Sequence, residues 1–265
     1  MSTYTRLRVE HDAGVAWIVF NRPDAGNAID ATMFEELPRA WDELSTDPTV
    51  RVIVVTGEGS AFSTGLDVVQ LAREPEALRE IAQRTRNAEL NFTSWQCDVW
   101  KPVIAAVNGV CAGGGLHFVA DADIVIAAAD ATFVDPHVSV GQVVAYEAIA
   151  LVRKSPMEPI VRMALTGRYE RITAARAYQL GIVSQVVDPP GQLRAEAQAL
   201  AEKIARNSPA AMAATKRALW GALEAGLSEA CLAGGQHLAG MWGHPDQTEG
   251  PLAFAERRDA AWQQT

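Results

Sequence analysis

A short apolar run that leads through three glycines into a helix is the feature that most constrains the fold of this chain. Residues Val103–Val107 are all apolar and rich in β-branched side chains, which is typical of a strand buried on both faces. Gly113, Gly114 and Gly115 follow, and the next residues have helical character. Glycine has no Cβ, so the backbone of this junction can approach another group closely. The pattern predicts a buried strand that passes through glycine into a helix.

A second junction of the same kind lies earlier in the chain. Residues 52–56 are typical of another buried strand, residues 57–60 form a loop, and residues 61–67 lead into a more helical segment. The first N–H groups of a helix have no intrahelical partner and lie at the positive end of its dipole. Two such junctions can direct two N–H donors at one point, which is the geometry of an oxyanion hole. The alternative is that both glycine turns serve packing only.

Short motifs in a characteristic order run through nearly the whole chain. They are Asn21-Arg22-Pro23 with Asn27-Ala28, Val52–Gly57, Ala61–Asp67, Lys101–Gly109, Ala112–Gly115, Ala122–Val125, Ala131–Phe133, Leu165–Gly167, Ala174–Val183 and Phe254. In this order and at this spacing the motifs resemble the crotonase superfamily, also called the enoyl-CoA hydratase/isomerase family. They are specific for the family but not for its reaction.

The order of predicted elements indicates the fold class. Strands and helices alternate before residue 187, which favours an α/β fold with a mostly parallel sheet and helices outside it. The resemblance implies a crotonase-like β-β-α spiral core with a C-terminal helical region. We place a soft boundary that assigns residues 1–190 to the core and 191–265 to the helical region. In this family the helical region supplies trimer contacts and completes a neighbour's acyl-CoA site, so the resemblance implies a homotrimer or a hexamer made of two trimers.

Periodicity and capping residues predict most of the individual elements. Two strands are expected within residues 4–20, and further strands over 50–55, 124–126, 132–134 and 182–187. Helices are expected over 31–44, 144–154, 157–166, 174–180, 192–206, 209–223 and 227–241. Asp30 is expected to cap the helix that follows it. Residues 66–95 are predicted to be helical with a break at Pro75, and a tail is expected from Pro251.

Composition and charge limit the partners of the chain. Its 265 residues are 49% hydrophobic, which is enough for a sizeable core. The formal net charge of −9 disfavours nucleic acid and anionic membrane as partners. Three widely spaced cysteines suit a reducing cytosol without disulfides or zinc. Because the sequence also has no signal pattern and no apolar run approaching ~20 residues, it predicts a cytoplasmic protein without a membrane span.

The resemblance assigns the two oxyanion-hole donors to Leu66 and Gly114. In the family, two backbone N–H groups bind the thioester oxygen of an acyl-CoA, and the matching motifs place them at the residue after Ser-Thr-Gly and at the middle glycine. Both positions lie at predicted helix starts, which supports the assignment on physical grounds. The loss of one such donor typically costs on the order of 3 kcal/mol of transition-state stabilisation.

Histidine occupies both acid–base positions of the family's hydratases. Those enzymes have one glutamate three residues after the middle glycine and a second one after a proline some twenty residues on, where this sequence has His117 and His137. Paired glutamates deliver protons to and from water during hydration of a C=C bond, and histidine can also transfer protons near neutral pH. The helix dipole should favour the neutral ring of His117. The alternative is that His117 is a wall residue of a remodelled pocket.

Glu147 is a third candidate for proton transfer. The family's Pro-Gly-rich segment after Gly141 is replaced by residues 142–147 here, and the resemblance places an acid in roughly this region in members that catalyse other reactions. A helix dipole is the structural explanation for an acid at that position. Asp135 could orient His137 as its hydrogen-bond partner, or it could serve only the loop in which it lies.

Coenzyme A is expected as part of the substrate, with no separate cofactor. The resemblance implies that five residues lie around it: Arg22, Ala28, Asp67, Lys216 and Phe254. A polyanionic ligand would need a local basic patch on this acidic chain. No metal is predicted, because His117 and Asp121 lie four residues apart but lack a third ligand.

Three functions remain open at this point. The first is an acyl-CoA lyase or hydratase of the enoyl-CoA hydratase type, which stabilises a thioester enolate in the backbone oxyanion hole. The second is a hydrolase that cleaves a thioester or a C–C bond next to a carbonyl, with histidine as the base that activates water. The third is a binder of acyl-CoA that does no chemistry.

Overall fold

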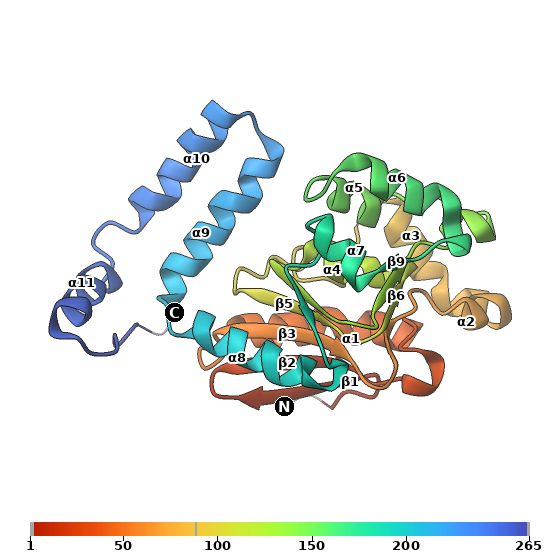
Figure 1. Cartoon of the computed structure of the whole chain (residues 1–265), viewed down its shortest axis with the longest axis horizontal. Helices are drawn as coiled ribbons and strands as arrows, with labels where there is room; N and C mark the ends of the chain where they lie inside the picture. Colours follow the sequence, from red (N-terminus) through yellow and green to blue (C-terminus); the bar gives the residue numbers. More distant parts are fainter. Residues whose placement is uncertain (1–2, 88, 264–265) are drawn as a thin grey trace.

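A six-stranded sheet lies at the base of the molecule in the computed structural model, which describes residues 3–87 and 89–263 (Figure 1). Its order is β1-β2-β3-β5-β7-β10. Only β1 and β2 pair antiparallel, and the remaining neighbours are parallel. The strands are β1 (Leu7–Asp12), β2 (Val15–Phe20), β3 (Val52–Gly57), β5 (Val103–Val107), β7 (Ile124–Ala128) and β10 (Gln185–Val187).

A smaller, four-stranded sheet has the order β4-β6-β8-β9. Its strands are β4 (Ala61–Ser63), β6 (Val110–Ala112), β8 (Thr132–Val134) and β9 (Ile172–Thr173). The first three each follow a strand of the large sheet and precede a helix, so a β-β-α unit that joins the two sheets occurs three times among the described residues. The predicted α/β fold with a β-β-α spiral core is confirmed.

The helices surround these sheets and continue into the C-terminal region. They are α1 (Ala31–Thr46), α2 (Val68–Arg73), α3 (Arg79–Arg86), α4 (Leu116–Asp121), α5 (Tyr146–Val152), α6 (Met157–Thr166), α7 (Ala174–Gln179), α8 (Leu193–Ala205), α9 (Pro209–Gly221), α10 (Leu227–Gly240) and α11 (Asp246–Glu256). Short 3-10 helices are η1 (Pro23–Ala25), η2 (Pro75–Leu78), η3 (Gly113–Gly115), η4 (His137–Val140), η5 (Gly167–Tyr169), η6 (Pro190–Gln192) and η7 (Ala222–Glu224). None of the described helices is long and apolar enough to cross a membrane.

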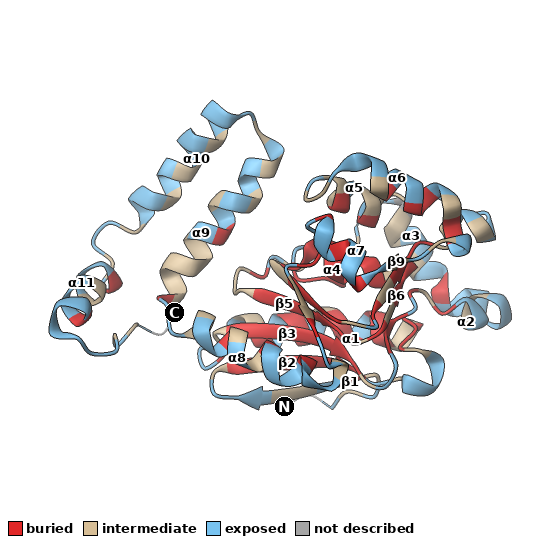
Figure 2. Cartoon of the chain, viewed as in Figure 1, coloured by how far each residue is buried: buried red, intermediate tan, exposed pale blue. Residues whose placement is uncertain are grey.

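The core forms where the large sheet is covered on both faces. Every residue of β2, β3 and β5 is buried (Figure 2), as their continuous apolar sequences predict. The carboxylate of Asp30 accepts the N–H of Met33 and so caps α1 as expected. Trp41 on the apolar face of α1 is buried, and its Nε1–H donates to the carbonyl of Phe92.

The C-terminal helices leave the core after α8. This helix packs its buried residues Leu193, Ala197 and Ala201 against the large sheet, whereas α9, α10 and α11 extend away from it (Figure 1). No residue of α10 is buried. The extension exposes several large apolar side chains: Leu219, Leu227, Leu232, Leu238, Trp242, Leu252 and Phe254. The boundary at residue 190 stays a prediction.

Two of the predicted elements are wrong, and in both regions tertiary contacts decide the structure. Residues 89–95, at the end of the segment that was predicted to be helical, contain no helix, because buried polar contacts hold them in an irregular conformation; the hydroxyl of Thr93, for example, donates to Asp121. Residues 251–256 of the predicted tail instead belong to α11, whereas residues 257–263 form no helix or strand. Glu249 on that helix forms an ion pair with Arg258, which holds the returning chain against it.

The last strand of the large sheet is shorter than predicted. Residues 182–187 were expected to be extended, but β10 contains only Gln185–Val187. The N–H groups of Ile182 and Val183 both donate to the carbonyl of Ala177 in α7. These two residues therefore close the end of α7 instead of pairing with β7. The periodicity of the sequence does not show that their N–H groups are used in this way.

Candidate active site

The first glycine junction exposes a backbone N–H at Leu66. Ile29 and Leu66 form an isolated parallel bridge, in which Ile29 N–H donates to Gly65 and Asp67 N–H donates to Ile29. In parallel pairing the bonds come from the residues on either side of Leu66, so its own N–H points away from Ile29. Asp67 then caps α2 by accepting the N–H groups of Val69 and Gln70. Leu66 is thus held at the start of a helix with its donor facing the other side of the bridge.

The second glycine junction lies directly against the first. A Cβ on Gly65 would be 2.6 Å from the nitrogen of Gly114, and a Cβ on Gly114 would be 3.5 Å from the nitrogen of Leu66. Gly114 lies in the first turn of η3, where an N–H has no intrahelical acceptor. Leu66 and Gly114 line the same cavity, which has a volume of about 730 Å³. The two predicted donors therefore meet at one cavity.

The three residues predicted to transfer protons lie close together near this junction, and Asp135 lies with them. We call His117, Asp135, His137 and Glu147 the acid–base cluster. The Oε2 atom of Glu147 is 3.4 Å from Nε2 of His117, and its Oε1 atom is 3.5 Å from Nδ1 of His137. Asp135 Oδ1 lies 2.6 Å from the same Nδ1 and also accepts the backbone N–H of His137. Glu147 therefore lies between the two imidazole rings.

Burial sets the protonation states of the acid–base cluster. Desolvation lowers the pKa of His117 to about 4, and the nearby charge of His137 lowers it further in the same direction. Desolvation raises the pKa of Glu147 to about 7. Burial opposes the charge of His137, but the hydrogen bond to Asp135 and the charge of Glu147 outweigh it and raise the pKa of His137. His117 is therefore neutral at pH 7, as expected, although burial and not a helix dipole is the main cause.

His137 is the member of the cluster that faces the place where the two glycine junctions meet at Leu66 and Gly114, which we call the oxyanion junction. We assign the Nδ1 proton to the hydrogen bond with Asp135, because a carboxylate only accepts. His137 lines the cavity that Leu66 and Gly114 also line. A Cβ on Gly113 would lie 3.6 Å from Cε1 of His137. Nε2 of the neutral ring is consequently left as the proton acceptor.

The same side chains could also bind a cation. The ligand atoms of Asp135, His137 and Glu147 lie within 4.8 Å of one another, and Oδ2 of Asp135 is buried without a hydrogen-bond partner among the described residues. The hydrogen bond between Asp135 and His137 already occupies two of the candidate ligand atoms. A metal ion that used Oδ1 of Asp135 and Nδ1 of His137 as ligands would have to displace that bond.

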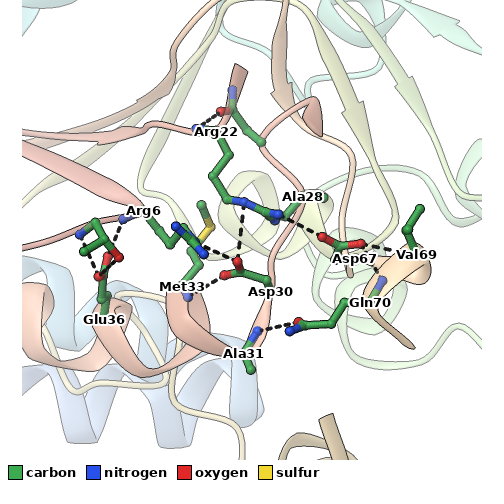
Figure 3. A network of polar contacts seen from close by, with 12 residues as sticks. Arg6, Arg22, Ala28, Asp30, Ala31, Met33, Glu36, Asp67, Val69 and Gln70 are labelled. Carbon is green, nitrogen blue, oxygen red and sulfur yellow. Dashed lines mark hydrogen bonds and ion pairs between the residues drawn. The ribbon is translucent and has the colours of Figure 1, made fainter. Parts of the chain in front are cut away.

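Arg22 connects three other residues that line the cavity, Ala28, Asp30 and Asp67 (Figure 3). Its guanidinium donates to the carbonyl of Ala28 and to Asp67 Oδ2 at 3.0 Å, and it lies 3.5 Å from Asp30. Arg6 forms a second ion pair with Asp30 at 2.7 Å. The three residues predicted around coenzyme A in this part of the chain, Arg22, Ala28 and Asp67, thus come together in one network. Acidic partners balance the charge of Arg22.

The other two residues predicted around coenzyme A lie elsewhere within this chain. Lys216 on α9 is buried, pairs with Asp123 Oδ2 at 2.8 Å, and lines a separate cavity of about 700 Å³. Phe254 on α11 is 87% exposed. Neither lines the cavity that contains Leu66 and Gly114, so their assignment stays a prediction.

A family model confirms the resemblance on which these assignments rest. Residues 10–265 match the model described as enoyl-CoA hydratase/isomerase. The chain belongs to this family. The predicted membership of the crotonase superfamily is confirmed.

Relatives in the enoyl-CoA hydratase/isomerase family match the chain over nearly its full length. The (E)-benzylidenesuccinyl-CoA hydratase of Thauera aromatica is 35% identical over 94% of this chain and 95% of its own. The carnitinyl-CoA dehydratase of Salmonella arizonae is 34% identical over 97% of both chains. The crystal structure of an enoyl-CoA hydratase/isomerase from Mycobacterium paratuberculosis superposes with a TM-score of 0.89 at 37% identity, over 99% of this chain and 100% of that one.

Sequence reasoning missed a second cavity beside the acid–base cluster. Its volume is about 280 Å³, and its lining includes His117, Trp95 and Trp220. Trp95 comes from the irregular segment before β5, and Trp220 comes from α9. Because the two tryptophans are far apart in the sequence and share no motif, no local pattern connects them.

Proposed function

We propose that this protein is an acyl-CoA enzyme of the enoyl-CoA hydratase type, which stabilises a thioester enolate with the N–H groups of Leu66 and Gly114. One observation carries the proposal: both residues line the cavity in which His137, hydrogen-bonded to Asp135, is also found. Two backbone donors beside a base held in one tautomer suit the formation of an oxyanion next to a proton transfer. The names of the relatives, which include a hydratase and a dehydratase of CoA thioesters, agree with this reaction class.

The proposed hydration moves two protons through the acid–base cluster. Nε2 of neutral His137 takes a proton from water as the oxygen adds to the β-carbon of the enoyl thioester. The electrons of the C=C bond then form an enolate, whose oxygen accepts the two backbone N–H groups. The protonated carboxyl of Glu147 gives a proton to the α-carbon. Proton exchange with water in the cavity that His137 lines removes the proton from Nε2 and returns one to the Glu147 carboxylate, which closes the cycle.

The test is spectrophotometry with crotonyl-CoA and with a longer trans-2-enoyl-CoA. We expect the absorbance of the conjugated enoyl thioester to fall while no free CoA appears, because addition of water removes the conjugation but leaves the thioester intact. Release of free CoA would instead indicate a thioester hydrolase. Saturable binding of both compounds without turnover would indicate a binder that does no chemistry.

Hydrolysis of a C–C bond is the second candidate, and one observation favours it. His137 lies between two carboxylates, and the net effect of its surroundings is a raised pKa, which makes the neutral ring a stronger base toward water. Water activated in this way could add to one carbonyl of a 1,3-dicarbonyl compound. The C–C bond would then break to give a carboxylic acid and an enolate, which is protonated to the ketone. Formation of one new carboxylic acid for each 1,3-dicarbonyl consumed would support this reaction.

We also propose that the chain assembles as a homotrimer or as a hexamer of two trimers. The extension formed by α9, α10 and α11 exposes many large apolar side chains, and a monomer rarely exposes a large apolar surface. Sedimentation equilibrium at micromolar concentration is expected to give three or six times the chain mass of 28.5 kDa. A mass equal to that of one chain would contradict the proposal.

A further inference from the structure

Three aromatic rings line the cavity of about 280 Å³ beside His117, which we call the aromatic cavity. Trp95, Tyr146 and Trp220 contribute rings to its lining, and Ile149 and Leu223 contribute aliphatic groups. Trp95 is half exposed. An exposed tryptophan at the edge of a cavity leaves a large apolar face available to a ligand.

The polar atoms of Tyr146 and Trp220 are bonded to residues that do not line the cavity, and the Lys154 ammonium lies over the Trp220 ring at 4.5 Å from its centroid. Nε1–H of Trp220 donates to Asp123 Oδ1 at 2.7 Å, and the hydroxyl of Tyr146 donates to the carbonyl of Thr85 at 2.8 Å. Trp95 and Trp220 are stacked, with ring centroids 6.4 Å apart and an interplanar angle of 27°. These contacts fix Tyr146 and Trp220 before a ligand arrives.

The aromatic cavity adjoins the acid–base cluster. His117 lines the aromatic cavity, His137 lines the cavity of the oxyanion junction, and Glu147 contacts both imidazoles. The ring of His117 lies 6.4 Å from that of Tyr146. No described residue lines both of these cavities, so a substituent on the β-carbon of a substrate held at the oxyanion junction would have to pass His117 to reach the tryptophans.

We propose that the aromatic cavity binds the aromatic ring of an aryl-substituted acyl group; this inference rests on the proposed acyl-CoA function. Aromatic rings attract one another at centroid separations of about 4.5–7 Å, beyond the effect of apolar burial alone. A linear aliphatic chain would gain only from burial. Discrimination between the two is therefore expected to depend on the ring of Trp95, which is the most accessible of the three.

The experiment compares the binding of two saturated thioesters, 3-phenylpropanoyl-CoA and hexanoyl-CoA, by isothermal titration calorimetry. Neither compound can be hydrated, so the result does not depend on turnover. We expect the wild-type protein to bind the aryl thioester about three- to tenfold more tightly, which is the usual size of an aromatic pair. Trp95→Leu is expected to abolish this preference, and Trp95→Phe is expected to keep most of it.

Trp100→Leu is the matched control, because Trp100 lines a different cavity and its Nε1–H bonds only to Asp98 among the described contacts. It is expected to leave the preference unchanged. Equal affinity of the wild-type protein for both thioesters, or an undiminished preference in Trp95→Leu, would overturn the aromatic site and leave the proposed function intact. Failure of both thioesters to bind would overturn both proposals.

Discussion

His137→Ala is expected to lower kcat/KM for an enoyl thioester by about 10²–10⁴-fold, which is the usual size of a general-base effect. The residue lines the cavity of the oxyanion junction, and its Nδ1 is held by Asp135 at 2.6 Å. His117, the other histidine of the acid–base cluster, lines the aromatic cavity and not the cavity of the oxyanion junction. Steady-state rates measured from the loss of enoyl absorbance give the comparison.

The pH profile should identify the same residue. His137 must be neutral to accept a proton, and its pKa is raised, so activity should fall as the pH drops through a value above the ordinary ~6.5 of histidine. Asp135→Asn removes a partner that favours the charged ring, so the acid limb of the profile should move to lower pH. Glu147 must be protonated to act as the acid, and its pKa is about 7, so activity should also fall above that pH. Because His137 and Glu147 interact, the pKa values read from the acid and alkaline limbs of the profile describe the pair and not either residue alone.

A surface histidine provides the control for this prediction. His11 on β1 is exposed, and His11→Ala should leave both the rate and the pH profile unchanged. If His137→Ala runs at the wild-type rate while Glu147→Gln is inactive, His137 is not the base, and Glu147 is the acid–base residue. In that event the acid limb should follow ionisation of the Glu147 carboxyl instead of a histidine.

The glycine junctions could be predicted because each is a local pattern. A buried strand followed by glycine and a helix start is visible within residues 52–67 and 103–116, and the structure has the expected elements in both places. Local sequence does not show that the two junctions touch. That contact depends on the parallel pairing of β4 with β6, which brings Gly65 against Gly114.

The acid–base cluster was predictable residue by residue but not as a cluster. His117 lies on α4, His137 begins η4, and Glu147 lies on α5. Only the pair of Asp135 and His137 is close in sequence, and it was the one contact that spacing could suggest. The position of Glu147 between both rings follows from the packing of α4 against α5, and the large changes in pKa follow from burial that only the folded chain provides.

The regions where sequence reasoning failed share a dependence on distant partners. Residues 89–95 were predicted to continue a helix, but buried contacts such as that between Thr93 and Asp121 hold them in an irregular conformation. The proline at 251 predicted an end of regular structure, yet α11 continues through it. Long-range contacts can outweigh local propensity by several kcal/mol in total, since each net hydrogen bond contributes about 1 kcal/mol.

Gly65→Ala is expected to reduce kcat by about 10²–10³-fold, the size of the loss when one oxyanion donor is removed. The new Cβ would lie 2.6 Å from the nitrogen of Gly114 and 2.8 Å from the carbonyl oxygen of Ala112. Both are backbone atoms, which cannot rotate away, so the N–H of Gly114 must shift. Gly114→Pro, which deletes the donor itself, should be at least as damaging.

Gly181→Ala is the control that separates the effect of backbone strain from loss of the N–H donor of Gly114. Gly65 has φ +83° and Gly181 has φ +78°, so the backbone conformation alone should cost alanine about 1–2 kcal/mol of stability at each position, and the close contacts of the new Cβ add to this cost at Gly65. A Cβ on Gly181 meets no described atom within 4 Å, so this variant should lose stability but keep its kcat. Thermal unfolding and steady-state kinetics on both variants give the comparison. If Gly65→Ala loses stability to the same extent as Gly181→Ala and retains full kcat, the N–H of Gly114 does not stabilise the transition state.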